Sequence, residues 1–191
     1  MDKNFPNRNE LMTRAIHFAQ ERHAGQVRKG TTRPYITHPM ETMKILSDMN
    51  ADTNLLIAGV LHDTLEDTNT TDTEIMENFG ADVCSLVTAH SEDKSKSWDE
   101  RKAHAIRTTQ NGSTRLKMLV LADKVANMRD MKYDYIQVGD KLWDRFNAPK
   151  EKQAWYYGRC QEALNEMQDY PETAPIYHEM ETAYKVLFNN T

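Results

Sequence analysis

Apolar residues recur along most of the chain every three or four positions, which is the spacing of one face of an α-helix. In the first such stretch, Leu11, Ala15 and Phe18 fall on one helical stripe. Asn7 and Glu10 stand before it with the spacing of a capping box. No run of alternating polar and apolar residues is long enough to predict a sheet. The pattern therefore predicts an all-α protein.

Capping and breaking residues divide this pattern into successive helices. Gly25 is placed to end the first helix, and Pro39 stands at a first-turn position that proline favours, so His38 lies at a helix N-terminus. Thr71 and Glu74 repeat the capping-box spacing. After the first helix, the predicted helices cover about residues 39–49, 53–67, 71–80, 82–90, 98–110, 114–131, 149–168 and 172–188, and residues 132–148 give the weakest pattern.

The length of the chain predicts one domain. A chain of 191 residues is long enough to bury a core without crosslinks, and no linker, internal repeat or low-complexity tract divides it. We expect a single compact domain over residues 1–191, with its chemical motifs in about 10–131 and further helices in about 149–188.

The charge and apolar content narrow the classes of partner. The formal net charge of -5 argues against a general nucleic-acid or membrane-surface binder. The N-terminus has no signal-peptide core, and no segment approaches the ~20 apolar residues of a membrane span. Cys84 and Cys160 each stand alone, without a CxxC partner. We expect a soluble cytoplasmic protein without disulfides, and a homo-oligomer remains open.

The stretch AGVLHDTLEDT, residues 58–68, interrupts a strongly apolar helix with four ionisable residues. On a continuous helix His62 and Glu66 lie one turn apart, as do Asp63 and Asp67, and the two rows are adjacent. Residues 55–61 are apolar in nearly every direction, which is typical of a helix packed on all sides. Buried charges need compensation by pairing, protonation or a metal ion, so this cluster should open into an interior cleft.

A second apolar helix, LKMLVLADKVANMRDM at residues 116–131, changes in the same way. Its apolar stripe continues into Asp123, Asn127 and Asp130. Asp123 therefore needs a partner for the same energetic reason as Asp63. One cation could serve both carboxylates.

Two imidazoles and two carboxylates are available for such a cation: His38, His62, Asp63 and Asp123. This mixed nitrogen and oxygen set suits manganese, iron, cobalt or zinc better than calcium. Taken alone, however, a His-Asp dipeptide is common, and a histidine before a proline is more often a helix cap than a ligand.

Simpler explanations exist for single members of the cluster. Asp67 and Thr68 could end their helix through local hydrogen bonds, and Asp123 could pair with Lys124 or Arg129 at an exposed surface. Neither explains why charges interrupt apolar faces. The remaining histidines are expected at the surface or in ordinary hydrogen bonds: His17, His23, His90, His104 and His178. Among them His23 is the first candidate for an exception, because it lies beside the basic loop, but it is not assigned to the metal.

A histidine, then HD, then a distant aspartate resembles the ligand pattern of the HD-domain metal-dependent phosphohydrolases. The segments HAGQVRKG, YITHP, LHDTLEDT, FGADV and LADKVANMR occur in that order. Together they resemble the hydrolase domain of RelA/SpoT-type alarmone enzymes, particularly the stand-alone small alarmone hydrolases. The resemblance covers about residues 10–131, and AWYYGRCQEAL extends it weakly. It implies a compact HD-domain helical bundle.

The resemblance implies a division of labour among the clustered residues. Glu66 and Asp67 would orient and activate the attacking water, while the ion polarises the phosphoryl group. The implied reaction is hydrolysis of a nucleotide 3′-diphosphate, (p)ppGpp or its adenine analogue, to pyrophosphate and GDP, GTP or the adenine equivalent. The implied cofactor is manganese, held by His38, His62, Asp63 and Asp123.

Three further residues fit an anionic nucleotide. Arg28 and Lys29 lie in a polar loop where two cations could bind phosphates, although basic loop residues are usually solvated. Asn127 matches the family's asparagine and could donate to the ribose or a phosphate. Its simpler role is a hydrogen bond to Asp123.

Several departures from the family pattern concern the nucleotide base. RKGTTRPYITHP is one residue longer than usual between its arginine-lysine pair and HP, and Asp130 stands where threonine is common. A carboxylate is unfavourable beside polyphosphate, so Asp130 should contact a base or a cation. SEDKSKSWDERK, residues 91–102, replaces a short threonine-lysine stretch. These changes leave guanine specificity open.

Two other functions compete with alarmone hydrolysis. An HD phosphohydrolase for another nucleotide or phosphate ester would use the same metal chemistry. A non-catalytic module that senses a nucleotide would need the ligands but not Glu66 and Asp67.

Overall fold

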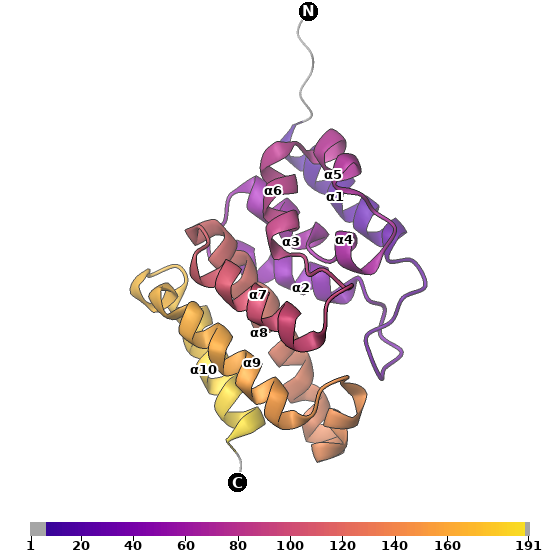
Figure 1. Cartoon of the computed structure of the whole chain (residues 1–191). Coiled ribbons are helices and arrows are strands. Elements are labelled where there is room, and N and C mark those ends of the chain that lie inside the picture. Colours follow the sequence, from indigo (N-terminus) through magenta and orange to yellow (C-terminus); the bar gives the residue numbers. More distant parts are fainter. Residues whose placement is uncertain (1–6, 190–191) are drawn as a thin grey trace, which may run out of the picture.

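Helices account for nearly all regular structure in the computed structural model, which describes residues 7–189 (Figure 1). Its helices are α1 Arg8–Arg22, α2 Thr37–Asp48, α3 Thr53–Leu61, α4 Thr64–Asp67, α5 Asp72–Phe79, α6 Ala81–His90, α7 Trp98–Gln110, α8 Thr114–Val138, η1 Gly139–Arg145, α9 Lys150–Ala163, η2 Asn165–Asp169 and α10 Ala174–Phe188, where η marks a 3-10 helix. Between residues 7 and 189, β pairing is limited to one isolated bridge between Val27 and Pro34. The all-α prediction is confirmed.

The predicted capping boxes explain where α1 and α5 begin, whereas α1 ends at Arg22, three residues before the predicted stop at Gly25. Asn7 and Glu10 form the capping box of α1, and Thr71 and Glu74 form that of α5. Gly80, at φ +89°, ends α5 in a conformation that other residues rarely adopt. The structure begins α2 at Thr37, two residues before the predicted start.

The helix predicted over 53–67 is wrong in one respect, because it breaks at His62 and Asp63 into α3 and α4. His62 Nδ1 lies 2.8 Å from the carbonyl of Gly59, and Thr64 Oγ1 donates to the carbonyl of Leu61 at 2.7 Å. Side chains that bond to carbonyls of the last turn compete with the helical ladder. The break therefore falls at the two residues with candidate metal-binding side chains.

Helix α8 is longer than predicted and lies at the centre of the molecule. It continues past residue 131 to Val138 and stops at Gly139, which has φ +59°. Met131 is buried, and Tyr135 and Val138 are packed against the core, so the polar end of the helix is held by tertiary contacts. Helices α2, α3, α6, α7 and α10 all contact α8.

The C-terminal helices cover the opposite side of α8 from the N-terminal ones. In Figure 1, α1 to α6 occupy the upper part, α9 and α10 the lower part, and α7 and α8 lie between. The stretch predicted as one helix over 149–168 divides into α9 and the short η2. Helix α10 packs on α8, α9 and η2, which joins this half to the common core.

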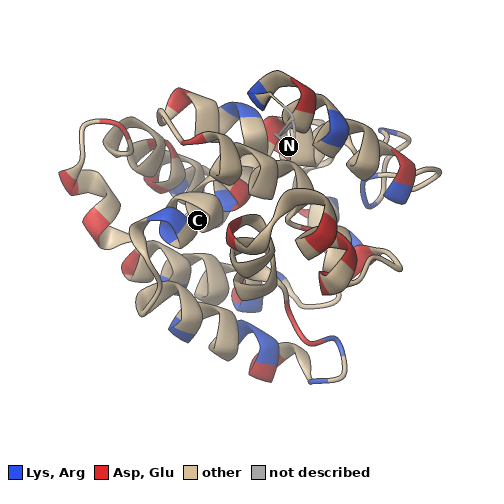
Figure 2. Cartoon of the chain, turned by 90° about the horizontal axis from the view of Figure 1, so that it is seen from above, with Lys and Arg blue, Asp and Glu red and all other residues tan. Residues whose placement is uncertain are grey.

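The remaining features of the fold are its surface charges, its cysteines and the lengths of its helices. Acidic and basic residues are interspersed along the helices (Figure 2). Cys84 and Cys160 are buried free thiols. Across residues 7–189, every helix is too short or too polar to cross a membrane.

Candidate metal centre and active site

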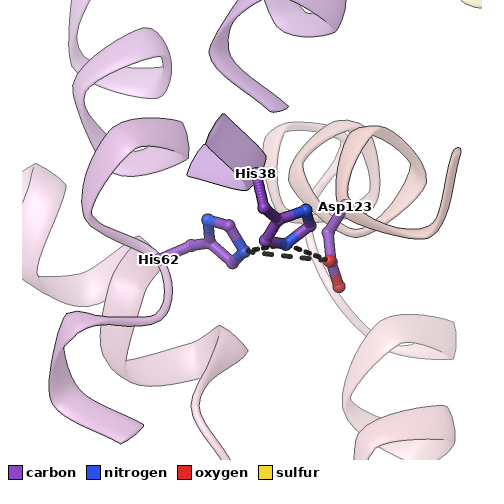
Figure 3. Close-up of side chains that lie close together, drawn as sticks. All are labelled: His38, His62 and Asp123. Carbon is purple, nitrogen blue, oxygen red and sulfur yellow. Dashed lines mark hydrogen bonds and ion pairs between the residues drawn. The ribbon is translucent and has the colours of Figure 1, made fainter. Parts of the chain in front are cut away.

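Three side chains from distant parts of the chain converge in the interior. His38 comes from the first turn of α2, His62 from the end of α3 and Asp123 from the middle of α8 (Figure 3). Their exposed fractions are 3%, 0% and 3%. Nε2 of His38 lies 3.2 Å from Nε2 of His62 and 3.2 Å from Oδ1 of Asp123. One donor atom from each lies within 4.8 Å of the others, so this group could hold a divalent metal ion.

Asp63 is adjacent to the same group. Its Oδ2 lies 3.2 Å from Nε2 of His62 and 3.5 Å from Nε2 of His38. Asp63 thus lies beside both imidazoles, although the group whose donor atoms all lie within 4.8 Å of one another is His38, His62 and Asp123. Neighbouring ligands with bonds of about 2.1 Å to an octahedral ion are separated by roughly 3.0 Å, so these spacings are close to those of a bound set.

Backbone and side-chain bonds orient the cluster. Nδ1 of His62 lies 2.8 Å from the Gly59 carbonyl, so in the neutral ring the proton is on Nδ1. The lone pair of Nε2 is then free to bind a metal ion. Asn127 Nδ2 donates to Asp123 Oδ1 at 2.6 Å. The simpler role predicted for Asn127, a hydrogen bond to Asp123, is therefore present.

Without an ion, the charges of the cluster compensate one another. Burial alone would lower the pKa of His62, but the carboxylates of Asp63 and Asp123 outweigh it and raise that pKa well above its usual value. Lys124 Nζ lies 2.7 Å from Asp123 Oδ2, so the pairing considered for Asp123 exists, though in the interior and not at an exposed surface. A divalent ion would take the place of the proton on His62.

A cavity of about 170 Å³ opens beside the cluster and is lined by both predicted catalytic carboxylates, Glu66 and Asp67. Burial, reinforced by the charges of Asp63, Glu92 and Asp67, raises the pKa of Glu66 to about 7. A carboxylate with this pKa can accept a proton from water near neutral pH. The position of Glu66 is therefore consistent with a general base.

Tyr35 is a site residue that the sequence analysis missed. Its hydroxyl lies 2.7 Å from Asp63 Oδ2 and 2.9 Å from Asp67 Oδ2, so it links a predicted ligand to a predicted catalytic residue. Burial and the nearby carboxylates raise its pKa, which keeps the hydroxyl protonated. The His23 ring stacks on it at 4.8 Å, and His23 bonds to Gln26, as expected of an ordinary hydrogen-bonded histidine.

Two lysines contribute positive charge to the lining of the cavity. Lys102 and Lys124 both line it, and their side chains are 18% and 12% exposed. The ring of Tyr156 lies 4.7 Å from Lys102 Nζ and 5.3 Å from Lys124 Nζ. Lys102 also pairs with Glu92 at 2.7 Å. The cavity is thus lined by both carboxylates and ammonium groups.

A second cavity of about 280 Å³ adjoins the first, and Arg28, Tyr35 and Asn127 line both. Arg28 Nη2 donates to Asn127 Oδ1 at 2.7 Å. Lys29 lines only the second cavity, where its Nζ donates to Asn147. Of the three predicted substrate-binding residues, Arg28 and Asn127 line the cavity beside the candidate ligands, and Lys29 does not.

Asp130 contacts cations, which was one of the two roles expected for it. Its oxygens lie 2.9 Å from Arg28 Nε and 2.6 Å from Arg33 Nη1. Asp134 holds Arg145 in the same way, at 2.7 Å. Three guanidinium groups face two carboxylates here, so the second cavity keeps a positive charge despite Asp130.

The segment that follows α6 reaches the predicted catalytic residues. Lys94, which is about half exposed, forms an ion pair with Asp67 and lies 3.9 Å from Glu66 Oε1. The backbone N–H of Glu92 donates to Glu66 Oε2 at 3.3 Å. The unusual residues 91–102 therefore form part of the cavity wall.

Among the five histidines left outside the predicted site, His90 is the one that the structure places in the cluster. Its Nε2 lies 3.3 Å from Asp123 Oδ2, and its side chain is 8% exposed. His17, His104 and His178 are exposed as expected. Position 90 ends an apolar helix, as position 62 does, and this was the available sequence signal.

Comparison with known proteins places these features in a family. Residues 15–151 match the family model described as HD domain. The guanosine-3′,5′-bis(diphosphate) 3′-pyrophosphohydrolase MESH1 of Xenopus tropicalis is 42% identical over 125 residues, which is 64% of this chain and 70% of that protein.

Two solved structures have the same fold over most of their length. The crystal structure of lmo0812 from Listeria monocytogenes is 34% identical, with a TM-score of 0.74 over 80% of this chain and 99% of that one. The structure of a metazoan ortholog of SpoT that hydrolyses ppGpp is 25% identical, with a TM-score of 0.76 over 95% and 97%. The chain therefore belongs to the HD-domain family, and within it the chain resembles the 3′-pyrophosphohydrolases of guanosine bis(diphosphate).

Proposed function

We propose that this protein hydrolyses a nucleotide 3′-diphosphate alarmone, ppGpp or ppApp, and releases pyrophosphate together with GDP or ADP. The observation that carries this proposal is the cavity in which the metal-type cluster, the carboxylates Glu66 and Asp67 and several cations meet. A relative that is 42% identical is named for this reaction, and a protein of the same fold hydrolyses ppGpp.

The proposed cofactor is a divalent ion, Mn²⁺, held by His38, His62, Asp63 and Asp123. The fit of these residues rests on the close approach of their donor atoms and on the two buried carboxylates, whose negative charge calls for a cation. An ion in this position would act as a Lewis acid on the phosphoryl group.

In this proposal Glu66 accepts the proton of the attacking water. Its pKa of about 7 lets it do so near neutral pH, and it contacts the cavity without being needed to neutralise the ion. Asp67 orients the same water, and Tyr35 and Lys94 hold Asp67 in place. The roles are separable, because removal of Glu66 leaves all four proposed ligands intact.

The cations around the cavity would bind the phosphates. Lys102 and Lys124 face the first cavity, and Arg28 stands between the two cavities. We therefore place the 3′-diphosphate in the first cavity, with Arg28 and Lys29 near the nucleoside side. Asn127 bridges Arg28 and Asp123, because it accepts a hydrogen bond from Arg28 and donates one to Asp123.

Product analysis tests this function. Mn²⁺-loaded protein is incubated with ppGpp and separately with ppApp, and the products are separated by ion-exchange chromatography. The expected result is GDP or ADP with pyrophosphate, at rates that rank the two bases. Orthophosphate as the only released phosphate would contradict the reaction, and two intact nucleotides would contradict the substrate class.

A pair of matched variants serves as the control. Asp63→Asn keeps the size of a proposed ligand but removes its charge, and it should abolish turnover. Asp169→Asn makes the same chemical change at an exposed position in η2 and should retain full activity.

A further inference from the structure

His90 occupies the same kind of position as the proposed ligand His38. Each imidazole directs Nε2 at a different oxygen of Asp123, His38 at Oδ1 from 3.2 Å and His90 at Oδ2 from 3.3 Å. In both rings the buried Nδ1 has no hydrogen-bond partner. The orientation of His90 is therefore not set by a hydrogen bond from Nδ1, and its other close contact is the edge of the His62 ring.

The rings form a continuous row around the cluster. The His62 ring centroid lies 5.0 Å from that of His38 and 5.0 Å from that of His90, with interplanar angles of 71° and 89°. His62 thus stands between two imidazoles that face one carboxylate.

We infer that His90 is a fifth protein ligand of the proposed metal ion, which makes the centre a site of three imidazoles and two carboxylates. This inference rests on the proposed function, since it assumes that the cluster holds an ion. His90 Nε2 lies 3.3 Å from Asp123 Oδ2, near the roughly 3.0 Å expected of neighbouring ligands on an octahedral ion. His90 lies outside the close group of His38, His62 and Asp123, so a bound ion would have to draw its ring inward.

Five protein ligands change what the centre can do. With five protein ligands the ion would have less room for water, so Glu66 and Asp67 would hold the attacking water, and the ion would supply Lewis-acid chemistry to the phosphoryl group. A third imidazole also shifts metal preference from manganese toward cobalt, iron or zinc, because imidazole suits these ions better.

A different role is available to His90, since its ring N–H could simply donate to Asp123 Oδ2 and position that carboxylate beside Lys124. Loss of such a bond would also weaken metal binding, typically by 10-fold to 100-fold, so affinity alone does not separate the two roles. The number of coordinated imidazoles does.

The test is proton NMR of the full chain loaded with one equivalent of Co²⁺. Each histidine bound through Nε2 keeps an exchangeable N–H on Nδ1, which the paramagnetic ion shifts far outside the normal range. Three such signals are expected in the wild type, and His90→Gln should lose one of them. His104→Gln, at an exposed histidine of α7, should keep all three.

Two shifted signals in the wild type would overturn the inference and leave His90 as a positioning residue, while the proposed metal centre would stand. A chain that takes up no Co²⁺ would contradict the metal centre itself and the role of His90 with it. The wild-type count decides between these outcomes even if His90→Gln does not fold.

Discussion

Replacing Glu66 by glutamine should stabilise the metal-free protein at alkaline pH while it removes activity. The Glu66 side chain is 19% exposed, and the carboxylates of Asp63, Glu92 and Asp67 surround it. Burial and these charges raise its pKa from 4.5 to about 7. Ionisation of Glu66 therefore destabilises the folded state. Glutamine has no ionisable group, so the variant avoids this cost.

The sign and size of the effect follow from the two pKa values. Below pH 4.5 the carboxyl group is protonated in the folded and unfolded chains, so it costs no stability. As pH rises through 4.5 and then 7, the unfolded chain ionises first, and the folded chain loses stability relative to it. At about 1.4 kcal/mol for each tenfold difference in proton affinity, the difference between 4.5 and about 7 corresponds to roughly 3 kcal/mol.

Urea unfolding in EDTA at pH 4.5 and pH 8 measures this difference. Glu66→Gln should exceed the wild type by about 2–3 kcal/mol in the free energy of unfolding at pH 8, and by much less at pH 4.5. Glu77→Gln, at an exposed carboxylate of α5, should change neither value. In the Mn²⁺-loaded protein, Glu66→Gln should keep its metal content and lose about 100-fold or more in kcat.

A Glu66→Gln protein that is no more stable than the wild type at pH 8 would refute the account of a buried, charge-crowded carboxylate. Wild-type kcat in the same variant would refute its role as the base. The two results are independent, because the first concerns the metal-free fold and the second the loaded enzyme.

Three further changes test other parts of the structure. Asp63→Ala should abolish both metal content, measured by atomic emission, and turnover, and retention of one ion per chain would exclude Asp63 as an essential ligand. Asp130→Asn should weaken the hold on Arg28 and Arg33 and alter KM for ppGpp more than kcat; an unchanged KM would show that this ion pair does not position the substrate. Leu61→Ala, at a fully buried position of α3, should lower the free energy of unfolding by about 2–5 kcal/mol in urea, and a loss below 1 kcal/mol would contradict tight packing there.

The helices and their ends were predicted from the sequence because their determinants are local. A capping box joins residues three positions apart, as in Asn7 with Glu10 and Thr71 with Glu74, and both formed as predicted. The break at His62 and Asp63 was missed because a periodic pattern does not record hydrogen bonds from side chains to the carbonyls of Gly59 and Leu61.

Three of the four proposed ligands, His62, Asp63 and Asp123, were identified because they interrupt apolar helices, where charges are costly unless something compensates them. His38 was added as a second imidazole at a helix N-terminus. The same reasoning did not reach Tyr35 or His90. A tyrosine in a polar loop carries no such anomaly in the sequence, and the place of His90 at the end of an apolar helix is a weaker signal than a carboxylate within one. Their roles depend on contacts with Asp63 and Asp123, which are 28 and 33 positions away along the chain.

The sequence by itself determined the helices, their caps and the residue types available to the site. Only the tertiary structure decided which partner each charged side chain contacts and where α8 ends. Asp130 pairs with Arg28 and Arg33, a third imidazole faces Asp123, and α8 extends to Val138. The physical reason is range, because propensity and capping act within a few residues, whereas burial and ion pairing depend on segments that meet only when the chain folds.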